Sequence, residues 1–390
     1  MDFLKIKSME SNNQLYQSDT PSNTIYDRTI SYLNEKYDIR FNYIALELEI
    51  SLKGSNEWKN LNINSLLIEL VQSGIEISMN RLEILVRSHL IQKYNPIVEY
   101  FENLTKWDGV DHIEKLSSYV KTSDNDAFNY HFEKWLTRTV LCALKKGYVN
   151  KQCFVLAAQQ NSGKSSFLRF LIPSKLEVYY TENVSLDKDG IIAICKNLLV
   201  NLDELAVFSK PDVNTLKSFI SKSSVNVRIP YAKKAELMER ICSFCGSTNR
   251  TDFLTDETGN VRWLIFEVLS IDFTYSQEID IDKVWSQAYY NAFEKEDYNP
   301  ELTAKDIEEN EKRNERYTEI SIEQEVIMKN YEKSIDFNEF LTATDIMLEM
   351  NSLSGLRLNN IRIGKALTKL KFERVKHPQR QIYGYLIRKK

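Results

Sequence analysis

A short apolar run, a polar loop and an amphipathic run follow one another near the middle of the 390-residue chain. Residues 153–158 are apolar and predict a buried strand, while residues 165–172 predict a helix that Pro173 ends. Between them lies a loop that closes with Gly163-Lys164-Ser165. Strand, loop and helix in this order build a phosphate-binding loop, in which backbone N–H groups and the helix N-terminus face an anion. The sequence therefore predicts an α/β fold organised around this loop.

The loop follows the pattern G-x-x-x-x-G-K-[ST], except that Ala158 stands at the first glycine position. An alanine serves there if its φ stays negative, because glycine is required only for left-handed backbone. Lys164 is expected to reach the β and γ phosphates of ATP, and Ser165 to ligate Mg²⁺. The residues predicted to hold the nucleotide are Gln160, Asn161, Ser162, Gly163, Lys164, Ser165 and Ser166.

A second apolar run, residues 197–202, ends in the neighbouring acids Asp203 and Glu204. Polar groups at the ends of parallel strands meet at one edge of a sheet, so Asp203 is expected beside the loop as a second Mg²⁺ ligand. Glu204 is then placed to polarise the attacking water as a general base. A strand followed by an acidic helix cap is the alternative interpretation, which the upstream loop makes less attractive.

A third strand-like run, residues 240–250, delivers Asn249 at its end. Asn249 is expected to orient the same water or the γ-phosphate, although asparagine is also an ordinary turn former. Residues 225–236, between the second and third runs, predict two strands around a basic tip. DNA-backbone contacts are expected there from Arg228, Lys233 and Lys234, and a solubilising surface turn is the alternative.

Composition and cysteine usage bound the class of protein. A hydrophobic content of 43%, a charged content of 27% and a net charge of -4 describe an ordinary globular chain. The chain has no apolar N-terminal signal and no apolar run of about 18 residues, so we expect a cytoplasmic protein without membrane contact. Five cysteines without framework spacing fit a reducing compartment. Cys242 and Cys245 have the spacing of half a zinc site. In a strand, however, their side chains would point to opposite faces and could not bind the same metal ion.

Charge and turn signals divide the chain into four expected segments. These are a flexible tail (1–25), a small α+β domain (26–95), an ATPase domain (96–295), and an acidic helical linker with a C-terminal domain (296–390). Residues 344–350 and 359–370 predict two helices, and residues 372–375 and 382–387 predict two strands, which is a winged-helix pattern. From residue 357 onward there are eleven Lys and Arg against one acid. We therefore expect DNA contacts from Arg362, Lys365, Lys369 and Arg380, with a protein-interaction module as the alternative.

Several of these motifs resemble the virulence-associated protein E family of phages and genomic islands, whose ATPase looks like a superfamily 3 helicase within the AAA+ class. The resemblance covers residues 95–269. It rests on Asn95-Pro96 with Lys106-Trp107-Asp108-Gly109-Val110, Gly163-Lys164-Ser165-Ser166-Phe167-Leu168-Arg169, Leu202-Asp203-Glu204-Leu205, Gly246-Ser247-Thr248-Asn249, and Thr255-Asp256-Glu257-Thr258-Gly259-Asn260-Val261-Arg262-Trp263.

The resemblance implies a hexameric ring that hydrolyses ATP between subunits and moves a DNA strand through a central channel. It puts Lys233 and Lys234 at the tip of the channel hairpin. Where the family usually has two arginines this chain has Val261-Arg262, so Arg262 is a candidate arginine finger, and the choice between it and Arg250 stays open. Family members often carry a primase domain, for which the first 95 or so residues are too few, so we expect a helicase without priming activity.

Three functions compete at this point. The first is an ATP- and Mg²⁺-dependent DNA helicase or translocase that acts in the replication of a phage or another mobile genetic element. The second is a DNA-binding initiator or regulator that uses ATP as an assembly switch; Ala158 favours it slightly, whereas Glu204 favours hydrolysis. The third, a metabolic P-loop kinase, leaves the basic C-terminal domain without a role.

Overall fold

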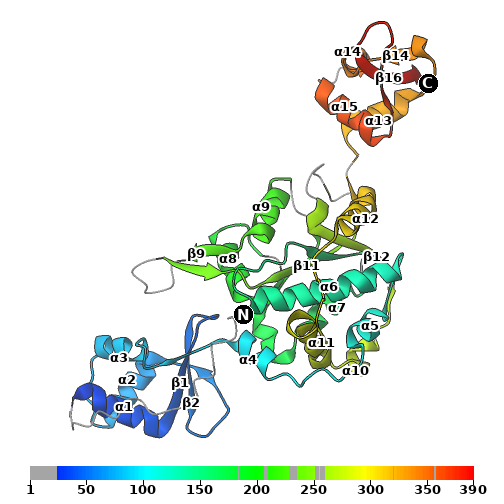
Figure 1. Cartoon of the computed structure of the whole chain (residues 1–390). Coiled ribbons are helices and arrows are strands. Elements are labelled where there is room, and N and C mark those ends of the chain that lie inside the picture. The colour runs from blue at the N-terminus through cyan, green and yellow to red at the C-terminus, as the bar shows by residue number, and fades with distance from the viewer. Residues whose placement is uncertain are drawn as a thin grey trace. The chain divides into compact units, whose positions relative to one another are not determined.

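The computed structural model falls into two compact units (Figure 1). Unit 1 comprises Met1–Asn249 and Val261–Glu311, and unit 2 comprises Arg250–Asn260 and Lys312–Lys390. The predicted flexible tail lies outside the described residues as far as residue 23. The structure describes residues 24–182, 184–205, 210–227, 235–250, 254, 260–318, 320–354 and 357–390.

A six-stranded sheet forms the centre of unit 1, with strand order β5-β12-β6-β11-β8-β7. The strands from β12 to β7 run parallel, and β5 pairs antiparallel with β12 at one edge. The chain therefore has a mixed α/β fold with a parallel central sheet, in which β6 lies between β12 and β11. The strands are β5 Val120–Thr122, β6 Cys153–Ala157, β7 Tyr180–Glu182, β8 Leu199–Leu202, β11 Ser243–Thr248 and β12 Trp263–Ile271.

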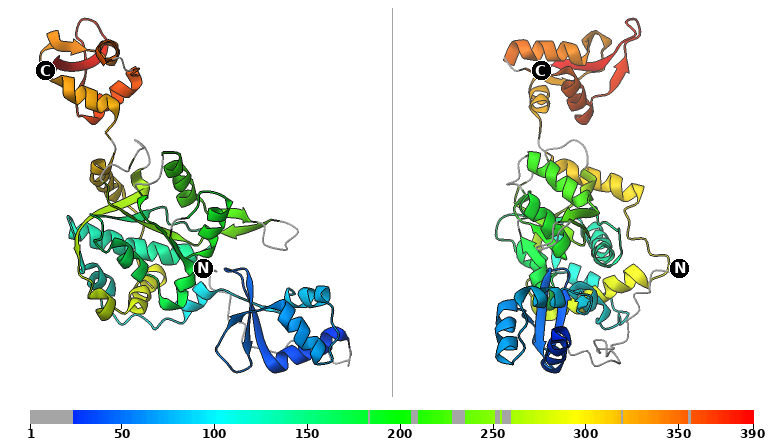
Figure 2. Two further views of the ribbon diagram at one scale, coloured as in Figure 1. Left: turned by 180° about the vertical axis from the view of Figure 1, so that it is seen from behind. Right: turned by 90° about the vertical axis from the view of Figure 1, so that its left-hand side faces the viewer.

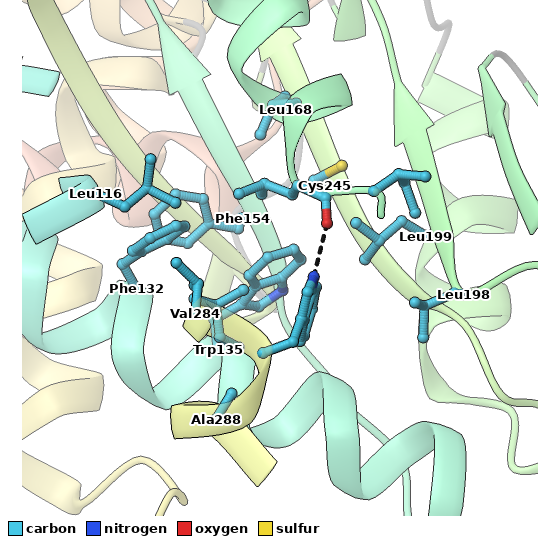
Figure 3. Packing of buried hydrophobic residues seen from close by; sticks show 14 of the residues in the cluster. Leu116, Phe132, Trp135, Phe154, Leu168, Leu198, Leu199, Cys245, Val284 and Ala288 are labelled. Carbon is cyan, nitrogen blue, oxygen red and sulfur yellow. Dashed lines mark hydrogen bonds between the residues drawn. The ribbon is translucent and has the colours of Figure 1, made fainter. Parts of the chain in front are cut away.

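Helices pack on this sheet and build the main core with it. The longest, α6 (Asn125–Leu144), begins where the Asp124 side chain accepts from Ala127 N and contacts α5 and α11 along its length. Figure 3 shows Phe154 of β6 close to Phe132 and Trp135 of α6. The remaining helices of this region are α4 Pro96–Glu102, α5 His112–Ser117, α7 Lys164–Phe170, η1 Ser174–Tyr179, α8 Lys188–Lys196, α9 Lys210–Ser221, η3 Asn260–Arg262, α10 Tyr275–Glu278 and α11 Ile281–Phe293.

Residues 24–94 form a smaller α+β module with its own apolar core. The alternation over residues 38–53 is split into a hairpin by a turn in which Leu46 has φ 63°. This turn docks on the sheet region: Ile44 is buried in the main core, and Asn42 Nδ2 donates to Tyr179 Oη at 2.8 Å. The sheet order is β3-β2-β1-β4. Its elements are α1 Ile25–Lys36, β1 Tyr37–Asn42, β2 Glu47–Leu52, β3 Lys59–Asn60, α2 Ile63–Gln72, α3 Met79–Val86 and β4 Gln92–Tyr94.

A two-stranded ribbon projects from the sheet region (Figures 1 and 2). It pairs β9 (Ser224–Val227) with β10 (Glu236–Glu239) in antiparallel fashion. At its base the buried Arg240 side chain donates to the Phe219 and Ile220 carbonyls at the end of α9, and to Asn150 O at 2.6 Å. The predicted DNA-contacting residues Arg228, Lys233 and Lys234 lie outside the described residues.

The acidic segment is less solvated than its charge suggests. Its helix α12 (Ala304–Asn314) places Asp306 against Lys134 of α6 at 3.3 Å, with side chains 9% and 7% exposed. Asn310 Nδ2 donates to Trp263 O at 3.0 Å. The density of charged residues in the sequence does not reveal these contacts, because only one face of the helix is buried and the other faces carry the exposed charges. Residues 296–311, expected in a linker, therefore pack on the sheet region.

Unit 2 has a separate apolar core that includes Ile327, Ile346, Ile363 and Leu367. Its helices and strands alternate around β16, which pairs with β13, β14 and β15. The elements are η4 Glu315–Tyr317, α13 Ile322–Asn330, β13 Tyr331–Lys333, η5 Phe337–Glu339, β14 Phe340–Leu341, α14 Ala343–Ser354, α15 Asn360–Lys369, β15 Arg374–Lys376 and β16 Tyr383–Lys389. Across the part of the chain that the structure describes, no helix combines the length and apolarity needed to cross a bilayer.

All five cysteines are buried free thiols, which gives a test of the fold. Burial raises the pKa of Cys195 and of Cys242 to about 12, and since the thiolate is the reactive form, native thiols should react slowly. We expect Ellman's reagent to label essentially none of them in buffer and all five in guanidinium chloride. Fast stoichiometric labelling of any cysteine in the native protein would contradict the packing.

Candidate nucleotide-binding site

The loop between β6 and α7 curls around an open space at the carboxyl edge of the sheet. Two of its residues have left-handed backbone: Asn161 with φ 61° and Gly163 with φ 84°. Ala158 is not among the residues with positive φ, and its N–H donates to Thr248 O at 3.1 Å, which prolongs the pairing with β11. The alanine is accommodated because its backbone is still part of the sheet, and the left-handed turn comes later in the loop.

Lys164, the first residue of α7, is buried and turns back over the loop. Its Nζ donates to Ala158 O at 3.0 Å, to Gln159 O at 2.7 Å and to Ser162 Oγ at 3.0 Å. Burial lowers the pKa of Lys164, and the negative charge of Asp203 partly offsets this. A cation held in a partly dehydrated loop at the N-terminus of a helix is suited to bind phosphate oxygens.

Asp203 follows β8 and lies opposite the start of α7. Its Oδ1 accepts from Ser165 Oγ at 2.8 Å and from Ser247 Oγ of β11 at 2.5 Å. The structure thus brings together the two residues that the sequence assigns to Mg²⁺. Carboxylate and hydroxyl oxygens are hard ligands of the kind Mg²⁺ uses alongside substrate phosphates and water. Within the described residues no group of three or more His, Cys, Asp or Glu forms a metal site, so an all-protein cage is not what this arrangement offers.

The predicted loop residues, the two acids and the amide line one cavity of about 280 Å³. Glu204 is exposed and has φ 52°, a backbone conformation that is rare for a residue with a side chain and is often found at functional sites. Asn249 is also exposed, one residue beyond β11. The lining residues are Gln160, Asn161, Ser162, Gly163, Lys164, Ser165, Ser166, Asp203, Glu204, Ser247, Thr248 and Asn249.

Ser247 and Thr248 line this cavity but are missing from the sequence prediction, which singled out only the amide at the end of their strand. The sequence did contain a signal for both residues, because they belong to the stretch Gly246-Ser247-Thr248-Asn249 on which the family resemblance partly rests. Gly246 has a local reason: a Cβ there would lie 2.9 Å from Leu202 O and 3.0 Å from Leu205 Cδ1. The glycine allows β11 to lie close to β8, which brings Ser247 within reach of Asp203.

Arg262 is not part of this cavity. It lies just before β12, and Trp263 is paired with Cys153 at the beginning of β6, whereas the loop follows Ala157 at the other end. At the rise of a strand this separation is about 15 Å. Arg262 Nε donates to Ser221 Oγ, the last residue of α9, at 3.1 Å. Arg250, in contrast, directly follows Asn249 in the chain.

The expected DNA-contacting cations of unit 2 are exposed. Arg362, Lys365 and Lys369 follow one another at helical spacing on α15, and Arg380 lies between β15 and β16. Arg362 forms a long ion pair with Glu323 at 3.9 Å.

A family model matches residues 101–319, and its description is "Virulence-associated protein E-like domain". The chain belongs to this family. The match confirms the resemblance drawn from the sequence, and the VapE-like domain includes the whole cavity and Arg262. No curated protein matches the chain.

Among solved structures, the chain is similar to the C-terminal region of NrS-1 in its apo form, with a TM-score of 0.52, 13% identity, and coverage of 93% of this chain and 98% of that one. The apo structure of the same region described as the A form gives a TM-score of 0.52 with 15% identity and the same coverage. At such identity the similarity establishes a shared fold.

Gly246→Ala should disturb the site through the sheet. The added methyl group meets the backbone of β8, so we expect the free energy of unfolding to fall by about 1–3 kcal/mol and ATP affinity to fall with it. Urea unfolding and calorimetric ATP titration measure the two effects. Gly364→Ala is the matched control, because its nearest atoms lie 3.8 and 3.9 Å away. Unchanged stability and affinity in Gly246→Ala would contradict the close approach of β11 and β8.

Proposed function

We propose that this protein is an ATP-driven DNA helicase or translocase of the superfamily 3 type, which assembles as a ring and acts in the replication of a phage or mobile element. The observation that carries the proposal is the polar cavity in which the loop lysine, the Ser165–Asp203 pair and Asn249 converge. Its residue types match what phosphoryl transfer needs, namely positioning and charge stabilisation. Membership of the VapE-like family supports an NTPase role of this kind.

Each residue has a role in this proposal. Lys164 exchanges its loop carbonyls for the β and γ phosphates, and the backbone N–H groups of the loop hold the remaining oxygens. Ser165 and Asp203 would hold Mg²⁺, which neutralises charge that develops on the phosphates. Glu204 accepts a proton from the attacking water, and Asn249 orients that water. The nucleotide-contacting set is completed by Gln160, Asn161, Ser162, Gly163 and Ser166.

Arg262 is proposed to act on the nucleotide of a neighbouring subunit. Its backbone lies beside the beginning of β6, about 15 Å from the loop at the other end of that strand, so its side chain cannot reach phosphates bound to its own chain. A guanidinium supplied in trans stabilises transition-state charge and makes hydrolysis depend on assembly. This favours Arg262 over Arg250, and a ring, a hexamer by family resemblance, is the assembly that supplies one such arginine to every site.

DNA is proposed to contact two regions. One is the ribbon β9–β10 together with the residues between its strands in the sequence, among them Arg228, Lys233 and Lys234. The other is unit 2, where the order of α14, α15, β15 and β16 supports a winged helix with α15 as the groove-reading helix. We propose residues 26–95 as an accessory α+β domain, 96–295 as the ATPase domain, and 296–390 as the linker and DNA-binding domain, with the start of the linker packed on the ATPase.

The first test is steady-state ATP hydrolysis with and without single- and double-stranded DNA. Lys164→Ala should abolish ATP binding, whereas Glu204→Gln should keep binding and lose roughly 10²-fold or more of the turnover, the usual contribution of a general base. Glu102→Gln, an exposed glutamate on α4, is the matched control and should hydrolyse like the wild type. Measurement of the molecular mass in solution, in the presence of nucleotide, should give the mass of a ring such as a hexamer.

The outcomes separate the two competing functions. DNA-stimulated turnover by a ring-sized species, lost in Lys164→Ala, supports the motor. Tight ATP binding without turnover in any condition would exclude the helicase function and favour an initiator that uses ATP as a switch.

A second test concerns unit 2. DNA binding by the full chain should weaken with salt, and each lost phosphate contact flattens the slope of log K against log salt by about 0.9 on duplex DNA. We expect a flatter slope when α15 loses Arg362, Lys365 and Lys369 to alanine. A control of equal charge, in which the exposed residues Lys106, Lys175 and Lys305 become alanine, should keep the wild-type slope. Equal slopes in all three proteins would exclude α15 as a DNA contact.

A further inference from the structure

Among the residues that the structure describes, those lining the cavity have side chains suited to phosphates, and none is an aromatic ring on which a nucleobase could stack. The lining consists of Gly163 together with serine, threonine, lysine, asparagine, glutamine and acidic residues. A base is a flat aromatic group that is best held by stacking on another ring. The base of a bound nucleoside triphosphate must therefore lie beyond the lining residues, at the rim.

Phe273 is an exposed aromatic residue next to Gly163, one of the residues that line the cavity. It follows β12 by two residues. Because β12 runs parallel to β6, both strands end at the same edge of the sheet. The ring lies on the phosphate loop: a Cβ atom at Gly163 would be 2.5 Å from Cε1 and Cζ of Phe273. Despite this contact Phe273 is 55% exposed, so the residue remains accessible to a ligand next to Gly163.

The segment that carries Phe273 is fastened to the helix that begins at the loop. Tyr275 is buried and packs edge-on against Phe167 and Phe170 of α7, with ring centroids 5.4 and 4.9 Å apart. Asp272 Oδ1 accepts from the N–H and hydroxyl of Thr274. The Phe273 carbonyl accepts from Ser276 Oγ at 3.0 Å. The backbone that carries Phe273 is thus fixed before any ligand arrives, which lowers the entropic cost of stacking.

We propose that Phe273 is the nucleobase platform of this site, on which the base of the bound nucleoside triphosphate stacks. The inference rests on the proposed function, since it needs a nucleotide whose phosphates lie in the loop. Stacking recognises a flat ring and not a hydrogen-bond pattern. Because stacking strength grows with the area of the ring, the platform should favour purines over pyrimidines.

The competing role for this ring is structural. A phenyl group against Gly163 could hold the phosphate loop in shape without touching the ligand. The two roles differ in one respect: a base platform matters only to ligands that have a base, whereas a support for the loop matters to every ligand that the loop binds.

The experiment compares Mg²⁺-ATP with Mg²⁺-tripolyphosphate, which has the phosphates but no base, by isothermal titration of the full chain. Phe273→Ala should weaken ATP binding on the order of tenfold to a hundredfold and leave tripolyphosphate within about twofold. Phe273→Leu keeps apolar bulk over Gly163 and should show the same selective loss, while Phe273→Trp should keep ATP affinity. Phe293→Ala, which removes another exposed phenylalanine on α11, is the control.

Failure has distinct signatures. Equal weakening of both ligands by Phe273→Ala and Phe273→Leu would make the ring a support for the loop and overturn the platform. ATP affinity unchanged in both variants would overturn it too. A wild-type chain that binds neither ligand would instead refute the nucleotide site itself, and Lys164→Ala, which should weaken both ligands, shows that the assay detects loss at the loop.

Discussion

One carboxylate oxygen holds the site together. Oδ1 of Asp203 accepts from Ser165 on α7 and from Ser247 on β11, and Asp203 itself follows β8. Three elements that are distant in the sequence therefore meet at a single partly buried charge, which is tolerated because it is hydrogen-bonded. The bond geometry depends on sheet register, and so on Gly246, which lets β11 approach β8. Any strain in the sheet is transmitted directly to the proposed Mg²⁺ position.

The same sheet keeps Arg262 away from the cavity of its own chain. Parallel strands put their beginnings and ends at opposite edges, and Arg262 lies at the beginning of β12. Its contact with Ser221 places it at the end of α9, where Arg240 also donates to backbone carbonyls and anchors the ribbon β9–β10. In the proposed motor, Arg262 completes a neighbour's site and the ribbon β9–β10 contacts DNA. Both are thus attached to the end of α9. A shift of α9 would move both.

Much of this arrangement was predictable because buried parallel strands have a strong signature. Residues 153–158 and 197–202 are apolar runs too short for helices, and the polar residues after them were expected at one edge. Other features had no such signature. The turn at Leu46 has φ 63° without a glycine, β5 and β7 have three residues each, and α12 buries one polar face through Asp306 and Asn310. Each of these depends on a tertiary partner and not on local propensity.

The sequence by itself determined the family and the residues on which the proposed chemistry rests. These are a lysine and a serine after a glycine turn, and two acids and an amide after strands. These are local patterns, because a phosphate loop is built from consecutive backbone groups. Only the tertiary structure decided that Ser247 joins Asp203, that Arg262 lies outside its own cavity, and that Phe273 lies over Gly163. Those relations follow from which strands pair and in what register. The paired residues lie about 40 to 110 positions apart, so no local sequence pattern specifies the pairing.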